Sequence, residues 1–236
     1  MSVTPGPLAL VGSGEYLPQM APIEAALLAH RAPRYVQLAT ASAPEGPSVV
    51  ARWHELGTRQ AERLGVEPII VEVNDRDDAD RLDFCDMIRG AGLIYLSGGN
   101  PTYLADTLRD TNVWRTIVET WRGGAALAGC SAGAMALGGW VPSLRHPRGG
   151  SSPGLGLLPR LGVVTHFDAF AARVPDFLTR IVLPDETAVT VFGIDEETAL
   201  VGGPTEWTVQ GRRSVWQLTR AGRVEFPHDA TVSTAP

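Results

Sequence analysis

The sequence predicts an α/β fold built on a doubly wound, mostly parallel sheet, with extra antiparallel strands toward the C-terminus. Short apolar runs alternate with longer amphipathic segments over the first part of the chain, which is the pattern of right-handed βαβ units. The run 125–128 is apolar throughout, as expected for a central parallel strand covered on both faces. Polar, glycine-containing clusters follow the apolar runs at 12–15, 97–100 and 129–133. Because ligands of such sheets bind at the carboxyl ends of the strands, these clusters mark the expected site.

The first part of the chain supplies the strands and helices of this sheet. Its short apolar, β-branched runs predict strands, bounded by glycine or polar residues, at 8–12, 35–40, 68–73, 92–96 and 125–128. A helix is expected at 22–30, where Pro22 stands in the permissive first turn. Over 48–64, apolar residues fall on one helical face and charges on the other. Further helices are expected at 78–89 and 102–123, the second of them broken near Asp110.

The remainder of the chain is richer in turns. The segment 138–159 is rich in glycine, proline and serine. This composition predicts a surface loop, which is a candidate lid over the site. A strand at 162–166 and a helix at 169–183 are expected to follow. Turn signals then separate short antiparallel strands at one edge of the sheet, predicted at 188–192, 198–201, 205–210 and 214–219. The tail 228–236 is expected to be frayed, and all 236 residues are assigned to one domain.

Composition excludes several classes of protein. The formal net charge of −6 and the absence of a dense basic run argue against nucleic acid as a partner. The chain has only two cysteines and no C-x-x-C pair, so a disulfide framework and a cysteine zinc site are not expected. No secretory signal precedes the first strand and no run of 18 apolar residues occurs. We therefore expect a cytoplasmic protein with no membrane partner.

The segment Gly129-Cys-Ser-Ala-Gly133 matches the nucleophile elbow G-x-S-x-G. It follows an apolar strand and opens an apolar helical segment, which is the context that the motif requires. The serine of an elbow occupies a strained turn where flanking β-carbons would collide with the backbone. Ser131 is therefore the candidate nucleophile, and the amide of Ala132 is a candidate oxyanion donor. Cys130 is the competing nucleophile, but its position before the elbow favours a small buried filler.

A second oxyanion donor is expected in the cluster at 97–100. Two consecutive glycines at the end of a strand allow the backbone to approach a substrate closely and to present an N–H group. Gly98 is equally explained by a tight turn that needs a positive φ. We favour Gly99 as the donor.

The serine needs a base, and the chain has five histidines. His166 ends an apolar strand and so reaches the same edge of the sheet as Ser131, unlike the other four. A carboxylate should then fix the imidazole tautomer. The acidic run 195–197 lies between two strands, and Asp168 lies two residues beyond His166, so both remain candidates.

Taken together, these residues resemble the aspartyl dipeptidase and cyanophycinase family of serine peptidases. The resemblance rests on five motifs that appear in one order along the chain: Val11-Gly-Ser-Gly-Glu15, Leu96-Ser-Gly-Gly-Asn100, Gly129-Cys-Ser-Ala-Gly-Ala134, Val164-Thr-His-Phe167 and Gly193-Ile-Asp-Glu-Glu-Thr-Ala-Leu200. It implies a flavodoxin-like fold similar to class I glutamine amidotransferases. It also implies a Ser-His-Glu triad at Ser131, His166 and Glu196, with oxyanion donors at Gly99 and Ala132.

The departures from the family concern specificity. Cyanophycinases carry Asp-Gln before the histidine and an arginine-rich run after it, whereas this chain has Val164-Thr165 and the run 168–172. A substrate with arginine-capped aspartates is therefore unsupported. Aspartyl dipeptidases need a cation to bind the aspartate of the substrate, a role that suits arginine. Arg173 and Arg180 both follow His166, and Arg180 is the candidate chosen here. Asn100 is a second candidate substrate-binding residue.

The expected function is serine-type hydrolysis of amide bonds in small peptides, dipeptidase-like with an acidic preference. This chemistry needs no metal or organic cofactor, and the expected partners are a small peptide substrate and a second copy in a homodimer. One alternative is a glutamine amidotransferase relative, although those enzymes need cysteine at the centre of the elbow. The other is a non-catalytic protein of this fold that binds a small amino-acid-like ligand.

Overall fold

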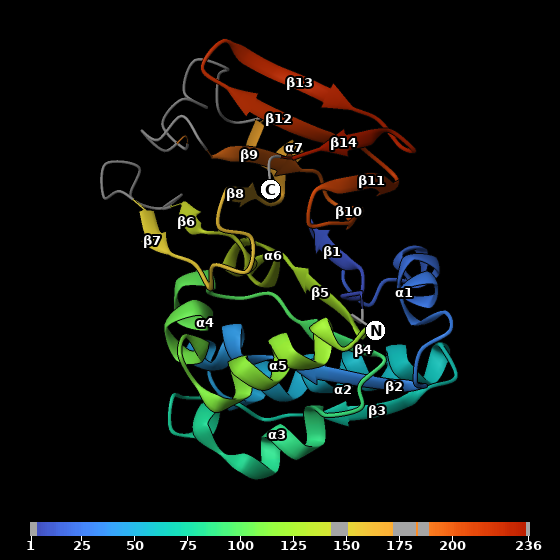
Figure 1. Ribbon diagram of the computed structural model, residues 1–236, viewed down its shortest axis with the longest axis vertical. Helices are drawn as coiled ribbons and strands as arrows, with labels where there is room; N and C mark the ends of the chain where they lie inside the picture. Colours follow the sequence, from blue (N-terminus) through green and yellow to red (C-terminus); the bar gives the residue numbers. More distant parts are fainter. Residues whose placement is uncertain (1–3, 143–150, 172–182, 184–188, 235–236) are drawn as a thin grey trace.

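The computed structural model describes residues 4–142, 151–171, 183 and 189–234, and its centre is an eight-stranded sheet (Figure 1). The strand order is β14-β11-β10-β1-β5-β4-β2-β3. The parallel strands are β1 (Leu8–Val11), β2 (Arg34–Leu38), β3 (Glu67–Ile70), β4 (Leu93–Leu96) and β5 (Ala126–Cys130). The antiparallel strands at one edge are β10 (Thr198–Gly202), β11 (Glu206–Gly211) and β14 (Thr231–Ser233). The predicted α/β class and mostly parallel sheet are confirmed.

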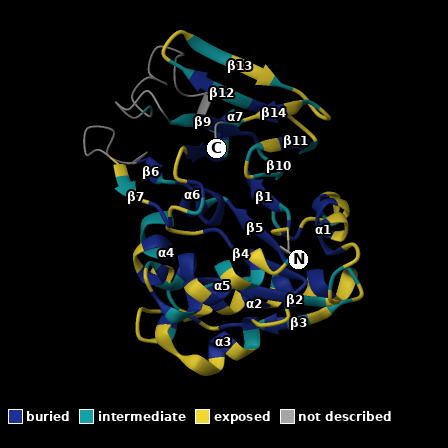
Figure 2. Ribbon diagram, viewed as in Figure 1, coloured by how far each residue is buried: buried dark blue, intermediate teal, exposed yellow. Residues whose placement is uncertain are grey.

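Helices cover both faces of this sheet, because alternate residues of each strand are buried on opposite sides. Leu8 and Leu10 of β1 join the core beneath four helices: α3 (Leu82–Ile88), α4 (Pro101–Leu108), α5 (Asn112–Arg122) and α6 (Ala132–Leu137). Ala9 and Val11 join a second core beneath two others: α1 (Ala21–Leu28) and α2 (Pro47–Arg63). The helices are buried toward the strands and exposed outward (Figure 2). Short 3-10 turns occupy η1 (Pro18–Met20), η2 (Thr40–Glu45) and η3 (Asp78–Asp80).

The predicted break in the segment 102–123 is confirmed near Asp110. Helix α4 ends at Leu108, and Asp110 has a φ of +63°. Thr111 then caps α5, because its hydroxyl accepts a hydrogen bond from the Trp114 amide. The helix predicted at 169–183 begins earlier, as α7 (Phe167–Ala171), and most of its predicted length lies outside the described residues.

The sequence predicted that the later strands would lie at one edge of the main sheet, but several of them form a sheet of their own. A separate four-stranded sheet has the order β13-β12-β9-β8, formed by β8 (Leu161–Val164), β9 (Thr190–Ile194), β12 (Val215–Thr219) and β13 (Gly222–Phe226). The physical reason is a third apolar cluster, in which Val164, Phe167, Val191 and Leu218 are buried together with Trp140. These side chains are buried against the second sheet and do not belong to either core of the main sheet.

The segment 138–159, expected to be an irregular loop, contains a short hairpin. Its strands are β6 (Trp140–Pro142) and β7 (Ser151–Pro153), paired antiparallel. The intervening residues 143–150, on which a lid role would depend, lie outside the described residues.

Residues 231–233 lie in the tail that the sequence predicted to be frayed, but they form a strand of the main sheet. Strand β14 pairs with β11, and Val232 stands opposite Trp207. Val232 is buried, and the indole nitrogen of Trp207 donates to the Thr234 hydroxyl at 3.2 Å. A single apolar residue among polar ones carries too weak a periodicity to reveal such a strand. Within the described part of the chain, no helix has the length and apolar character needed to cross a bilayer.

Helix α1 carries a buried carboxylate, Glu24, which makes the stability of the fold depend on pH. Its Oε2 accepts a hydrogen bond from the Tyr35 hydroxyl at 2.9 Å. Burial raises the pKa of Glu24 from 4.5 to about 7, against the lowering effect of the Tyr35 hydrogen bond. The folded state therefore binds a proton that the unfolded state releases near pH 4.5. The stabilisation that comes from the raised pKa of Glu24 is complete below pH 4.5 and is lost as the pH rises toward 7.

We expect Glu24→Gln to remove this pH dependence, because the amide mimics the protonated acid and cannot ionise. The variant should match the parent near pH 4.5 and exceed its free energy of unfolding at pH 8. The gain should be on the order of 3 kcal/mol, since each pKa unit corresponds to about 1.4 kcal/mol. Urea unfolding of both proteins at the two pH values measures it. Equal pH profiles for the parent and the variant would contradict a raised pKa at this position.

Candidate active site

Three loops meet at one edge of the main sheet. Strands β1, β5 and β4 are neighbours and run parallel, so their carboxyl ends lie side by side. The loop 12–15 follows β1, Ser131 follows β5, and the turn 97–100 follows β4. The sequence-based prediction that these clusters gather at one edge is confirmed.

The backbone at Ser131 has the geometry of a nucleophile elbow. Its φ of +49° and ψ of −111° are unfavourable for a residue with a side chain, and α6 begins at the next residue. A β-carbon at Gly129 would lie 2.5 Å from the carbonyl carbon of Gly133, and one at Gly133 would lie 2.2 Å from the Leu96 oxygen. Only glycine fits at these two positions, because the strand, the turn and the helix approach so closely.

Ser131, His166 and Glu196 form a hydrogen-bonded chain. The Ser131 Oγ lies 3.0 Å from His166 Nε2, and His166 Nδ1 lies 2.9 Å from Glu196 Oε1. A neutral imidazole that donates from Nδ1 to a carboxylate presents an unprotonated Nε2 to the serine hydroxyl. The His166 and Glu196 side chains are 45% and 41% exposed, so the chain of side chains is open to a ligand from solution.

The second sheet brings His166 to this place. Strand β8 runs parallel to β9 in a register that pairs Val164 with Gly193, so His166 stands just beyond the end of β8. The next residue, Phe167, is completely buried, and a β-carbon at Gly193 would lie 2.4 Å from its ring. Phe167 therefore anchors His166, whose own φ is +52°.

Glu196 lies where the chain crosses from one sheet to the other. Strand β9 belongs to the second sheet and β10 to the main sheet, and residues 195–197 connect them. The Glu197 amide donates to the Ser13 carbonyl at 3.2 Å, and the Gly12 amide donates to Thr198 at 2.9 Å. These bonds attach the crossing to the loop after β1, close to Ser131.

Asp168, the competing candidate, faces a different partner. Its Oδ1 accepts a hydrogen bond from the Glu196 amide at 3.0 Å, and its Oδ2 pairs with Arg213. Asp168 therefore supports the backbone of Glu196, while the Glu196 side chain contacts His166.

The two acids beside Glu196 are also occupied elsewhere. Asp195 is buried and accepts hydrogen bonds from the Trp216 indole at 3.1 Å and the Ser214 amide at 3.3 Å. Burial raises the pKa of Asp195, and the Trp216 bond opposes that rise. Glu197 forms an ion pair with Arg212 at 2.8 Å, and this hydrogen bond lowers the pKa of Glu197.

The turn 97–100 leaves one amide without a partner among the described residues. The Gly98 N–H donates to Glu15 Oε1 at 3.1 Å, and the Asn100 N–H donates to the Ala41 carbonyl at 2.7 Å. The Gly99 N–H, between them, has no acceptor in that part of the chain. Gly99 has a φ of +137°, and a β-carbon there would lie 2.4 Å from Ala41.

Cys130 points away from solvent. It is completely buried, and its thiol lies 2.8 Å from Glu15 Oε2. Burial raises the pKa of Cys130, and the neighbouring Glu15 carboxylate raises it further. The thiol therefore stays protonated and inaccessible, as its interpretation as a buried filler requires.

Of the predicted substrate-binding residues, Asn100 has a structural role and Arg180 lies outside the described residues. The Asn100 Oδ1 caps α4 by accepting from the Tyr103 amide at 3.0 Å. Glu15 was given no role from the sequence alone, although it belongs to the polar cluster 12–15 that was expected at the site.

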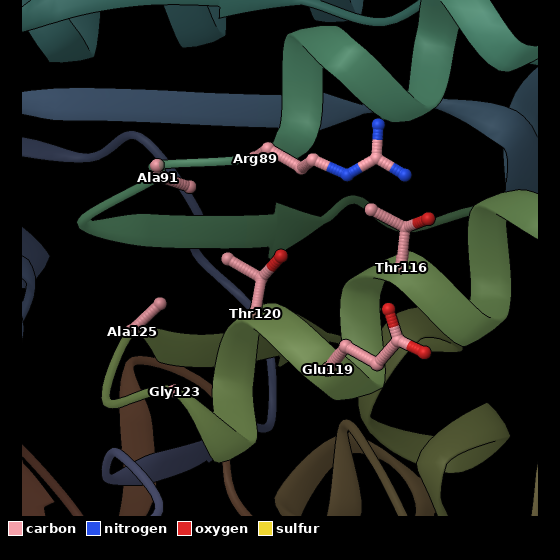
Figure 3. Close-up of a pocket in the computed structure, with 8 residues that line it drawn as sticks. Arg89, Ala91, Thr116, Glu119, Thr120, Gly123 and Ala125 are labelled. Atoms are coloured by element: carbon pink, nitrogen blue, oxygen red, sulfur yellow. The ribbon is translucent and has the colours of Figure 1, made fainter.

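A pocket of about 340 Å³ lies at the opposite end of the strands (Figure 3). Ala91 and Ala125, which line it, come just before β4 and β5, whereas Ser131 follows the far end of β5. Arg89 and Glu119 line it as well. This pocket is therefore separate from the candidate active site.

Comparisons with known proteins show the family to which the chain belongs. The model of peptidase family S51 matches residues 8–206. The chain is 29% identical to a cyanophycinase from Trichormus variabilis over 167 residues, which are 65% of this chain and 54% of that protein. It is 31% identical to a cyanophycinase from Synechococcus elongatus, covering 64% of this chain and 49% of that protein. The chain thus spans about half the length of these curated relatives.

Two solved structures extend the similarity over most of the chain. A peptidase from an acI-B1 actinobacterium is 40% identical, with a TM-score of 0.89, over 99% of this chain and 98% of that one. A protein described as a peptidase E, from Listeria monocytogenes, has a TM-score of 0.65 at 18% identity, over 89% of this chain and 100% of that one. The second likeness shows the fold alone. Because the family model matches well over half of its residues, the chain belongs to peptidase family S51.

Proposed function

We propose that the protein is a serine peptidase that hydrolyses amide bonds in small peptides through an acyl-enzyme. Ser131 is the nucleophile, His166 the general base and Glu196 the group that orients the imidazole. The single observation that carries the proposal is the hydrogen-bonded chain from Ser131 Oγ to His166 at 3.0 Å and from His166 to Glu196 at 2.9 Å. The strained backbone of Ser131 and the family membership support it.

In the proposed reaction, His166 Nε2 takes the proton of Ser131 as Oγ attacks the scissile carbonyl carbon. The resulting imidazolium is stabilised by Glu196, and it then protonates the departing amine. Water, deprotonated by the same imidazole, releases the acyl group from Ser131. Each proton that His166 accepts is returned within the cycle.

The amides of Gly99 and Ala132 are the proposed oxyanion donors. Two observations support Gly99: its N–H lacks an acceptor among the described residues, while both neighbouring amides are bonded. Ala132 opens α6, where the first amides of a helix have no intrahelical acceptor and the helix dipole favours negative charge. Losing one such donor typically lowers turnover about 10² to 10³-fold.

The proposed substrates are dipeptides with an acidic residue, and Arg180 remains the proposed cation for that carboxylate. Near the triad, Arg212 and Arg213 are already paired with Glu197 and Asp168. A dipeptide library that includes Asp-X peptides, read by amine release, tests this preference. We expect Asp-X peptides to be cleaved in preference to the others. Cleavage of other dipeptides at equal rates would remove the acidic preference.

The glutamine amidotransferase alternative is disfavoured by the position of Cys130. Its thiol is completely buried and faces Glu15, while a serine occupies the elbow centre. The protein should therefore show no glutaminase activity and should keep its peptidase activity after iodoacetamide treatment. Glutamine hydrolysis that iodoacetamide abolishes would favour the alternative.

A further inference from the structure

Glu15 connects the two turns that would form the oxyanion hole. It lies in the loop after β1, and its carboxylate contacts residues at the carboxyl ends of two parallel strands, β5 and β4. Oε1 accepts from the Gly98 amide, after β4, at 3.1 Å. Oε2 lies 2.8 Å from the thiol of Cys130, the last residue of β5 and the one before Ser131. Both oxygens of one side chain are therefore engaged beside the proposed nucleophile.

The packing at Gly98 shows how closely these groups are held. A β-carbon added there would lie 2.8 Å from Glu15 Oε1 and 3.4 Å from the Ser131 β-carbon. The Glu15 carboxylate and the Ser131 side chain thus both lie close to the Gly98 α-carbon. A shift of Glu15 would change the distance between the 97–100 turn and the elbow.

The raised pKa of the Cys130 thiol, caused by burial and by Glu15, agrees with a thiol that donates to this carboxylate. Glu15 is thereby held from both sides. Gly98 is therefore fixed firmly, and so is the peptide plane that follows it.

We propose that Glu15 is a positioning residue that sets the Gly99 N–H of the proposed oxyanion hole. Glu15 accepts from Gly98 on one side of Gly99, and Ala41 accepts from Asn100 on the other. The middle amide, which has no acceptor among the described residues, is thereby held in register with Ser131. Oxyanion donors act only when they lie about 2.7 to 3.1 Å from the developing charge. The inference rests on the proposed function, and in this role Glu15 does not contact the substrate.

The test compares the rate at which a fluorophosphonate probe labels Ser131 in four proteins. In this reaction the Ser131 oxygen bonds to phosphorus, fluoride leaves, and the phosphoryl oxygen needs the same donors as a peptide oxyanion. Glu15→Ala removes the acceptor of Gly98. Glu15→Gln keeps an acceptor oxygen without the charge. Cys130→Ala removes the thiol partner and leaves the bond to Gly98 in place.

We expect Glu15→Ala to lower the maximal labelling rate about 10 to 100-fold, which is part of the effect of losing one oxyanion donor. The probe concentration that gives half of the maximal rate should stay within about threefold of the parent value. Glu15→Gln and Cys130→Ala should each stay within about fivefold of the parent rate, because the Gly98 acceptor is kept. A merely structural role for Glu15 predicts a lower melting temperature in Glu15→Ala without this selective loss of the maximal rate.

Three results would overturn the inference: Glu15→Ala labelling as fast as the parent, Glu15→Gln as slow as Glu15→Ala, or Cys130→Ala as slow as Glu15→Ala. If Glu15→Ala does not fold, Glu15→Asp takes its place in these comparisons, because its shorter side chain draws the carboxylate away from the Gly98 amide. A parent protein that is folded but never labelled would instead remove the proposed function, so the two failures are distinguishable.

Discussion

Replacing Ser131 with alanine is expected to abolish peptide hydrolysis, with a loss on the order of 10⁶ in turnover. The hydroxyl oxygen that lies 3.0 Å from His166 Nε2 is the group that attacks the scissile carbonyl in the proposed reaction, and nothing replaces it in the variant. The rate of amine release from any dipeptide that the parent cleaves measures the effect. The melting temperature should stay close to that of the parent, because the side chain that is removed is small and only partly buried.

Ser131→Cys is the matched control for this prediction. It restores a nucleophile at the same position, and iodoacetamide should then inhibit a protein whose parent is insensitive. Hydrolysis by Ser131→Ala at the parent rate would remove Ser131 from the mechanism.

The second large effect is expected at Glu196. Glu196→Gln should lower turnover on the order of 10³ to 10⁴-fold, because an amide no longer enforces the tautomer in which Nδ1 donates and Nε2 accepts. Asp168→Asn is the matched control, since its oxygen can still accept from the Glu196 amide, a bond of 3.0 Å in the parent. That variant loses the ion pair with Arg213 and should lose less than tenfold in turnover.

Steady-state turnover rates of the two variants show which of the two carboxylates orients the imidazole. A larger loss in Asp168→Asn than in Glu196→Gln would assign the orienting role to Asp168. Equal small losses would mean that neither carboxylate orients the imidazole.

Much of the main sheet was predictable because parallel strands buried on both faces have a simple signature. The apolar runs near β1, β4 and β5 are continuous, and each ends in a polar cluster. Because the carboxyl ends of parallel strands lie at one edge of such a sheet, Ser131 and the 97–100 turn could be placed together there. The elbow could also be predicted from the sequence, because Gly129 is required by a close contact with Gly133, only four residues away.

The second sheet and the proposed role of Glu15 could not be predicted in the same way. Whether β9 pairs with β8 or with a strand of the main sheet depends on which apolar faces remain uncovered, as Phe167 and Val191 show. The role of Glu15 depends on a carboxylate that contacts residues 83 and 115 positions away. Contacts at such separation follow from the assembled fold, and a local sequence pattern does not contain them.

The acyl-transfer account is tested most directly by mapping the site of fluorophosphonate labelling. Intact mass and peptide mapping of the folded parent should show one adduct, on the Ser131 peptide, and His166→Ala should form it far more slowly. A folded parent that forms no adduct, or one that carries it on a residue other than Ser131, would contradict the account.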